Sequence, residues 1–392
     1  MIRGRIRALA GRLGFPVPER EGSTPPQGRD RERIRELSGR VKKLRRRLEE
    51  KDRELESLRA RLRQVRDEKG APPVFFIVGR ARSGTSWLMR TLNYHPEILC
   101  RGEGRFFGRD FQREDFKRMD LKTIQATSLY RAILDSDPLR LWIERSVWSR
   151  DRDIDESLAR LTRSAVTHFL TERLSETGKR IVGDKTPFLS METISEISEI
   201  LPQAKVIHVI RDGRDVAVSS VHHRWNHAKD EGGIYELDPE EIAKRRAYRE
   251  DPEKLLRAGE SIFTERGLRN AAGSWNGLVS RSVRDGPVLL GDNYAEVRYE
   301  DLLQRPQKEV GRLLRFLGAD AGEETVDRCV NEASFERWAE GRRRGQEDST
   351  AFLRKGVEGD WRNVFTGRDR EIFKEEAGDL LVELGYERDH NW

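Results

Sequence analysis

Cysteine is scarce in this sequence, and its few residues are isolated. Cys100 and Cys329 are the only cysteines among 392 residues, they form no C-x-x-C pair, and none of the seven histidines stands at zinc-ligand spacing from them. Two isolated cysteines exclude a disulfide framework and argue against a structural zinc site. We therefore expect no metal centre and a reducing, cytoplasmic compartment.

Membrane-directed segments are also lacking. No run approaches 18 consecutive apolar residues, and the basic N-terminus has no apolar stretch behind it. From these absences we expect that the chain has no transmembrane helix and no secretory signal peptide.

A net positive charge is absent from most of the chain, although the formal net charge of the whole is +6. Residues 1–70 contain 22 Lys+Arg and 12 Asp+Glu, a balance of +10, so the remainder carries 6 − 10 = −4. A nucleic-acid-binding body would be expected to be basic. We therefore expect no nucleic-acid partner.

Residues 29–69 show the pattern of a coiled coil. Apolar residues fill nine of ten seam positions of a heptad grid over 34–65, and the tenth is Lys51. Such a pattern predicts self-association into a homo-oligomer, with the lysine favouring few strands. The alternative is a single solvated, highly charged helix.

Residues 1–28 form a basic arm and a linker. Within 1–15, apolar residues share one helical face with arginines around it, a pattern that suits peripheral contact with an anionic membrane. A frayed terminus is the alternative. Proline, glycine and serine mark the following residues as a flexible linker.

The body, residues 72–392, alternates short apolar runs with amphipathic segments. Strand-to-loop patterns occupy 74–79, 179–187, 204–215 and 295–303, and helical patterns separate them. This alternation predicts an α/β fold, a P-loop-type parallel sheet flanked by helices and preceded by the coiled-coil helix. Ligands of such sheets bind at the carboxyl ends of the strands.

The first of these strand ends carries an incomplete phosphate-binding loop. Gly79, Gly84 and Ser86 have the spacing of G-x-x-x-x-G-K-[ST], but Thr85 stands where a nucleotide triphosphatase has its lysine. Backbone N–H groups at the helix start still suit a phosphate, and Arg82 and nearby hydroxyls add donors.

A second and a third basic loop follow. The strand 205–210 ends in Arg211 rather than in the aspartate that holds magnesium in an NTPase. This predicts a second anion held directly by the protein, with Ser219 on the next helix within reach. Asp212 as a metal ligand is the alternative. The stretch 354–366, with Arg354 and Lys355, reads as a glycine-containing cover for an anion.

Together the three loops resemble the 3′-phosphoadenosine 5′-phosphosulfate (PAPS)-dependent sulfotransferase family. "RSGTSW" resembles its 5′-phosphosulfate loop, "RDGRDVAVS" its 3′-phosphate motif and "RKGVEGDW…FT" its closing loop, in the family's order. The resemblance covers most of 73–392 and leaves the coiled coil unexplained. It implies a bacterial, cytoplasmic sulfotransferase that uses PAPS as donor, needs no metal and releases adenosine 3′,5′-bisphosphate (PAP).

The resemblance also assigns donor-binding residues. The 5′-phosphate would be held by Arg82, Ser83, Gly84, Thr85 and Ser86. Trp87 would pack on the adenine, with a core position as its alternative. The 3′-phosphate would be held by Arg211, Ser219, Arg354, Lys355 and Gly356.

The catalytic base is a point of departure within the family. The small-molecule branch uses a histidine in a "KTHLP"-like loop, whereas this chain reads "GDKTPF". "HPEILCRGEGRFF" instead resembles tyrosylprotein and glycosaminoglycan sulfotransferases, which implies Glu103 as general base. Arg82 and Lys185 would stabilise the developing charge, and Arg105 would contact substrate. An ion pair of Glu103 with a neighbouring arginine is the alternative.

Several other residues are weaker candidates for a role in the active site. His208 reads as a buried strand residue, and His222 and His223 as minor candidates for a catalytic group. Core packing is expected for Trp142, Trp148 and Tyr130, and stacking on an acceptor is the alternative.

The acceptor-binding segments are expected in 106–178 and 224–275, where no family motif occurs. The function indicated is sulfuryl transfer to the hydroxyl of a carbohydrate, lipid, phenol or peptide tyrosine. A P-loop kinase-like phosphotransferase, or a coiled-coil scaffold with a nucleotide-binding body, are the alternatives.

Overall fold

A computed structural model gives the arrangement of the body. It describes residues 72–108, 128–149, 151–186, 192–228, 236–348, 351 and 354–392, and four single helical residues: Gly39, Lys43, Arg47 and Lys51. The chain divides into unit 1, residues 1–71, and unit 2, residues 72–392. The predictions of a coiled coil, a membrane-binding arm and a linker therefore lie outside the described residues, apart from those four.

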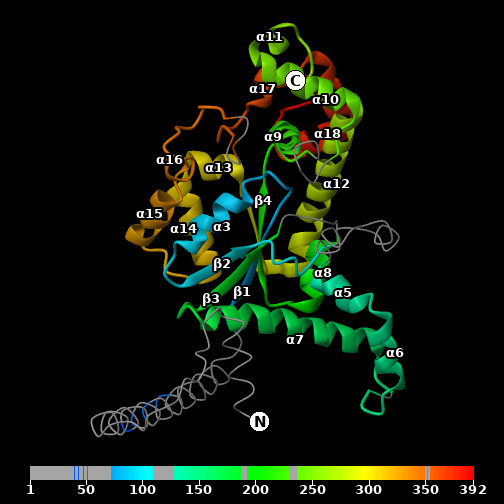
Figure 1. Ribbon diagram of the computed structural model, residues 1–392, viewed down its shortest axis with the longest axis vertical. Coiled ribbons are helices and arrows are strands. Elements are labelled where there is room, and N and C mark those ends of the chain that lie inside the picture. The colour runs from blue at the N-terminus through cyan, green and yellow to red at the C-terminus, as the bar shows by residue number, and fades with distance from the viewer. Residues whose placement is uncertain are drawn as a thin grey trace, which may run out of the picture. The chain divides into compact units, whose positions relative to one another are not determined.

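Five parallel strands form the centre of unit 2 (Figure 1). Their order is β2-β3-β1-β4-β5, and every neighbouring pair is parallel. The strands are β1 (Val74–Val78), β2 (Ile98–Gly102), β3 (Ile181–Lys185), β4 (Lys205–Ile210) and β5 (Tyr294–Arg298). Central strands of a parallel sheet are covered on both faces, which explains their nearly continuous apolar runs. The predicted parallel α/β sheet is thus confirmed.

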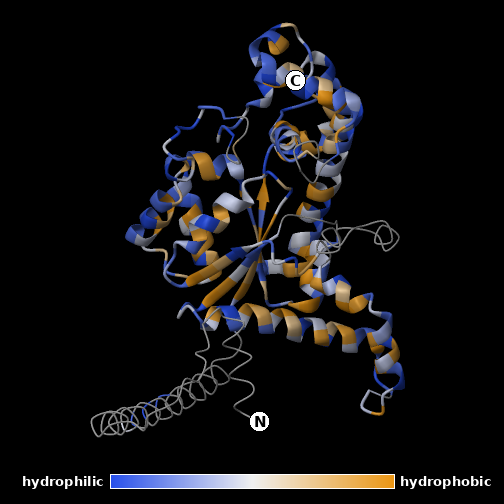
Figure 2. Ribbon diagram, viewed as in Figure 1, coloured by the Kyte–Doolittle hydropathy of each residue, from blue (hydrophilic) through white to orange (hydrophobic). Residues whose placement is uncertain are grey.

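Helices pack on one face of the sheet, where they contact every second side chain of each strand. Phe75 and Ile77 of β1 pack in a buried cluster with residues of α3 (Thr85–Asn93), α14 (Pro306–Leu317) and α15 (Glu323–Glu332). In Figure 2 the strands are hydrophobic and the surrounding helices show both colours. This amphipathic pattern is typical of helices that cover a sheet.

The other side chains of β1 point to the opposite face of the sheet. Phe76 and Val78 pack with residues of α7 (Ile154–Ser175), α8 (Thr193–Ile200) and α12 (Glu265–Leu290). Phe107, beyond β2, joins this cluster through an edge-to-face contact with Phe76 at 5.3 Å between ring centroids. The segment after β2 therefore crosses to the face opposite α3.

A third cluster lies beyond the end of β4. It joins α9 (Gly213–Asn226), α10 (Pro239–Glu250), α11 (Pro252–Arg257), α17 (Trp361–Val364) and α18 (Gly367–Glu383) to part of α12. Figure 1 shows these helices gathered at the end of the molecule where the C-terminus lies. The remaining elements are α5 (Leu129–Leu134), α6 (Asp137–Arg145), the 3₁₀ helix η3 (Gly291–Asn293), α13 (Tyr299–Gln304) and α16 (Phe335–Trp338).

Two sequence expectations about single residues have opposite outcomes. His208 is fully buried on β4, as expected. Trp142 and Trp148 are 57% and 84% exposed, so the expectation that they pack in the core is wrong. Trp142 lies in the second half of α6, and Trp148 follows that helix. No helix in the described part of the chain is long and apolar enough to span a membrane.

Candidate active site

The loop between β1 and α3 carries the first group of candidate residues. Gly84 is the N-cap of α3 with φ 89°, and a Cβ there would lie 2.4 Å from Cδ2 of Tyr299. Only glycine therefore suits this turn. Thr85 and Ser86 are the first residues of α3. The backbone N–H groups of these two residues have no partner within the helix and are available to a ligand.

Arg82 is fixed within this loop from two directions. Its φ is 75°, a left-handed conformation uncommon outside glycine. Its Nε donates a hydrogen bond to Oγ of Ser219 on α9 at 3.1 Å. Its carbonyl oxygen accepts a hydrogen bond from Nη1 of Arg211 at 3.0 Å. The first and second basic loops are thus joined directly.

Arg211 follows β4 and has a fixed guanidinium. Nη2 donates to the carbonyl of Val357 at 3.2 Å, and the guanidinium carbon lies 4.4 Å from the ring centroid of Tyr299. Asp215, one turn later on α9, lies 4.0 Å from Nη2. Asp212, the alternative metal ligand, pairs with the buried Arg214 at 2.8 Å and caps α9.

The third loop is held by two buried carboxylates. Asp215 accepts hydrogen bonds from the backbone N–H groups of Gly359 at 2.6 Å and Trp361 at 3.0 Å. Asp360 pairs with Arg354 and, at 2.7 Å, with Lys355. Burial alone would raise the pKa of Asp360, but the two cations outweigh it and lower this pKa to about 2. Asp360 is therefore ionised at neutral pH, and its carboxylate orients both cations.

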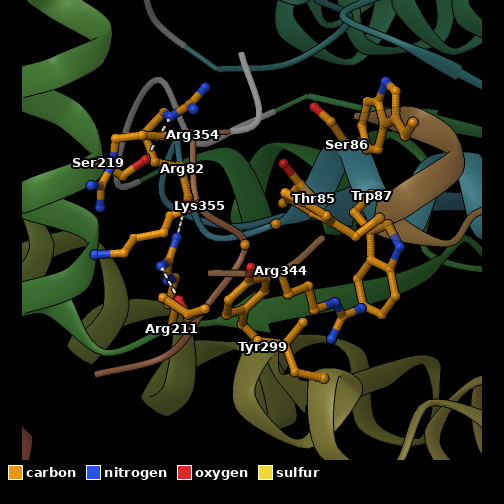
Figure 3. Close-up of a pocket in the computed structure, with 16 residues that line it drawn as sticks. Arg82, Thr85, Ser86, Trp87, Arg211, Ser219, Tyr299, Arg344, Arg354 and Lys355 are labelled. Atoms are coloured by element: carbon orange, nitrogen blue, oxygen red, sulfur yellow. Dashed lines mark hydrogen bonds between the residues drawn. The ribbon is translucent and has the colours of Figure 1, made fainter. Parts of the chain in front are cut away.

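The three loops line one cavity (Figure 3). Nine of the ten residues predicted to hold the two phosphates line it; the exception is Ser83, which is buried beneath the loop. Among the described residues, the lining contains five cationic side chains, Arg82, Arg211, Arg344, Arg354 and Lys355, and no carboxylate. Such a cavity suits a ligand with several negative charges.

Aromatic side chains complete the wall of the cavity. Trp87 lines it while being 8% exposed, and its Nε1 donates to the carbonyl of Ala333 at 2.8 Å. Trp87 is therefore a core residue that also forms part of the cavity wall, and its packing on an adenine stays a prediction. Tyr299, Phe335 and Trp338 also line the cavity, and flat rings of this kind suit a nucleobase.

Glu103 and Lys185 form a separate pair beside the donor loop. Nζ of Lys185 lies 3.0 Å from Oε1 of Glu103, and the side chains are 4% and 56% exposed respectively. The expected alternative partners of Glu103 were Arg101 or Arg105, so the ion pair is real but its partner differs. Glu103 and Arg105 have φ angles of 62° and 50°. Strain of this kind is concentrated at functional sites.

The two histidines of α9 differ in their surroundings. His222 packs edge-on against Trp225 and Tyr248 in the third cluster, at 5.2 and 4.9 Å between centroids. His223 lies one helical turn beyond Ser219. Burial, and then the charge of Arg82, lower the pKa of His223 to about 4, while Glu103 acts in the opposite direction. His223 is therefore a neutral imidazole at neutral pH.

Sequence reasoning did not name several residues of the site. Tyr299 follows β5, and its place at a strand end was the available signal. Phe335 and Arg344 come from segments that resemble ordinary surface helix and loop, and only the tertiary fold brings them to the cavity.

Comparison with known proteins places the chain in a family. The family described as "Sulfotransferase domain" matches residues 72–384. The chain therefore belongs to the sulfotransferase family.

Among curated proteins, sulfotransferase 1A1 of Bos taurus is 28% identical over 185 residues, which cover 44% of this chain and 53% of that protein. Sulfotransferase 1B1 of Mus musculus is 30% identical over 223 residues, 51% of this chain and 65% of that protein. The chain spans about half the length of these relatives.

A solved structure, mouse sulfotransferase SULT7A1 complexed with PAP, aligns over 79% of this chain and 84% of its own, with 19% identity and a TM-score of 0.42.

Proposed function

We propose that the chain transfers a sulfuryl group from PAPS to an acceptor hydroxyl and releases PAP. One observation carries this proposal. In the part of the chain that the structure describes, one cavity at the carboxyl edge of the sheet is lined by five cations, a helix N-terminus and four aromatic rings, without any carboxylate. PAPS bears a 5′-phosphosulfate, a separate 3′-phosphate and an adenine, and each has a matching part of this wall.

The donor-binding roles follow from the placement of the residues. Arg82, Thr85 and Ser86 would hold the 5′-phosphate at the start of α3. Ser219 and Arg211, with Arg354, Lys355 and Gly356 of the third loop, would hold the 3′-phosphate. Trp87 would contact the adenine. The buried Ser83 would support the loop from beneath.

The chemical step would use the pair beside the donor loop. The acceptor oxygen attacks sulfur, the bond between sulfur and the bridging phosphate oxygen breaks, and PAP leaves. Glu103, half exposed, would take the acceptor proton, and Lys185 and Arg82 would stabilise charge on the transferring group. Arg105, two residues beyond the base, would contact the acceptor.

The identity of the catalytic base indicates which branch of the sulfotransferase family the chain resembles. The absence of a histidine after Lys185 and Thr186, together with the strained turn at Glu103, supports the glutamate-base mechanism. The proposed acceptor is a hydroxyl compound of one of the classes named above: a carbohydrate, lipid, phenol or peptide tyrosine.

A thermal-shift experiment with the full chain tests the donor. PAP is compared with ATP plus magnesium, in the wild type, in Arg211→Ala and in Arg224→Ala. Arg224 is a matched control, since it pairs with Glu241 and lines no part of this cavity. A ligand at 100 times its Kd adds about 2.7 kcal/mol to the free energy of unfolding.

We expect PAP to stabilise the wild type and Arg224→Ala, and to stabilise Arg211→Ala much less. Stabilisation by ATP and magnesium alone would contradict the proposal and favour a kinase-like phosphotransferase.

A further inference from the structure

Asp184 is a carboxylate in an unusual place, near the carboxyl end of an interior strand. It is the fourth residue of β3, between β2 and β1, and it is 3% exposed. The preceding residues Ile181, Val182 and Gly183 are apolar or small. Burial raises the pKa of Asp184, so its charge is costly at this position, and an apolar residue would suit the strand better.

Both oxygens of Asp184 have defined partners. Oδ1 accepts a hydrogen bond from the backbone N–H of Gly104 at 2.8 Å. Oδ2 accepts one from Oγ1 of Thr186 at 2.5 Å. Thr186 thereby fixes the carboxylate, and the carboxylate fixes Gly104.

The bond to Gly104 reaches the centre of the turn that carries the proposed base. Glu103 and Arg105, on either side of Gly104, both have left-handed φ angles. A Cβ on Gly104 would lie 2.7 Å from Oδ1 of Asp184, so the close approach requires glycine. Such a turn persists only where its surroundings hold it.

A second bond fastens the same turn to the same strand. The backbone N–H of Glu103 donates to the carbonyl of Lys185 at 2.6 Å. Two consecutive amides of the turn are therefore held by two consecutive residues of β3. This arrangement places the Glu103 carboxylate 3.0 Å from Nζ of Lys185.

We propose that Asp184 is a positioning residue for sulfuryl transfer, which holds the Glu103–Arg105 turn so that Glu103 stays beside Lys185. This inference rests on the proposed role of Glu103 as base. Asp184 acts through its hydrogen bond to Gly104 and has no contact with the donor cavity, whose lining does not include it.

The principal test uses Asp184→Ala, Asp184→Asn and Glu196→Gln in the full chain. Asparagine retains an oxygen that can accept from Gly104, so it is the conservative rescue variant. Glu196 is a matched control: it is also 3% exposed and accepts from a backbone N–H, that of Gly108 at 2.7 Å, farther along the same segment.

Turnover is measured as PAP release from PAPS with p-nitrophenol present, which counts transfer to the phenol and to water. We expect Asp184→Ala to lower kcat about 10- to 100-fold, the order of effect of a small misplacement of a catalytic group. Asp184→Asn should recover to within about threefold of the wild type, and Glu196→Gln should leave kcat unchanged. The PAP thermal shift should be the same in all variants.

A double-mutant cycle separates positioning from general structural support. If Asp184 acts through Glu103, adding Asp184→Ala to Glu103→Gln should not reduce kcat further. Normal kcat in Asp184→Ala, or a full additive loss in the double variant, would overturn the proposal.

Amide hydrogen exchange gives a readout that needs no turnover. We expect faster exchange at Glu103 and Gly104 in Asp184→Ala than in the wild type and Asp184→Asn; unchanged exchange would overturn the proposal. Absence of a PAP shift in the wild type would instead refute the proposed donor, so the two failures are distinguishable.

Discussion

The donor cavity and the Glu103–Lys185 pair adjoin the same loop but are built differently. Four cations of the donor cavity are held by a hydrogen bond or an ion pair: Arg82 by Ser219, Arg211 by Val357, and both Arg354 and Lys355 by Asp360. The pair on the other side consists of one buried cation and one half-exposed carboxylate on a strained turn. The first arrangement suits binding of a fixed polyanion, and the second suits proton transfer to an exchangeable acceptor.

This difference indicates that donor binding and turnover should be separable by mutation. Pre-oriented cations bind equally well before and after the chemical step, whereas a base acts only during it. Changes in the cavity should therefore alter PAP affinity, and changes in the pair should alter kcat.

The largest effect is expected for Glu103→Gln. Loss of a positioned base should lower kcat roughly 10²–10⁴-fold while the Kd for PAP stays within about twofold. Steady-state turnover and PAP titration measure the two quantities. Glu97→Gln is the control, since Glu97 pairs with Arg180 at 2.6 Å on the N-terminal side of β2. Near-normal turnover in Glu103→Gln would remove this residue from the mechanism.

Next in size is Asp215→Ala, which should weaken the donor half alone. The backbone N–H groups of Gly359 and Trp361 would lose their acceptor, at about 1–3 kcal/mol for each buried group left unpaired. We expect PAP affinity to fall about 10- to 100-fold by calorimetry. Asp379→Ala, which changes a 99% exposed carboxylate, should leave it unchanged. A lower kcat with normal PAP affinity would contradict the expectation that cavity residues affect donor binding and not turnover.

His208 tests whether acid sensitivity comes from the fold or from the base. Burial lowers its pKa to about 3, against about 6.5 in an unfolded chain. Between these values only the unfolded chain binds the proton, so acidification lowers the free energy of unfolding, by about 2 kcal/mol from pH 7 to pH 5. In His208→Gln, urea unfolding should depend less on pH by that amount. An unchanged dependence would exclude this cause.

The smallest effect is expected for Ser219→Ala. Arg82 would lose its hydrogen-bond acceptor at Nε, a change of about 1 kcal/mol, or five- to tenfold in PAP affinity. The adjacent Ser220→Ala is the control, because Ser220 lines a different surface. Equal effects of the two substitutions would show that Ser219 has no special role toward Arg82.

Sequence patterns predicted the central part of the fold well because interior parallel strands are mostly apolar. The strands at 74–78 and 205–210 are examples. Strand β2 was not recognised, since it lies at the sheet edge and only Ile98, Leu99 and Cys100 are buried.

The candidate site was predicted only where its residues lie in short local motifs. Asp184 and Asp215 were not predicted as supports because each binds backbone N–H groups distant in the chain. Residue type alone does not reveal such contacts. Trp142 and Trp148 were expected in the core from their size, but local sequence does not show which helix face is covered.

The convergence of all five strand ends has a consequence for how the protein acquires activity. Arg82 follows β1, Glu103 follows β2, Lys185 ends β3, Arg211 follows β4 and Tyr299 follows β5. The strands β2-β3-β1-β4 bring the first four of these residues together, and the set is complete only when β5, the last strand in the chain, has paired with β4 at the sheet edge. During synthesis a nascent chain would have no donor site until β5 and the 354–360 loop had emerged. PAP binding would therefore report completion of the whole sheet.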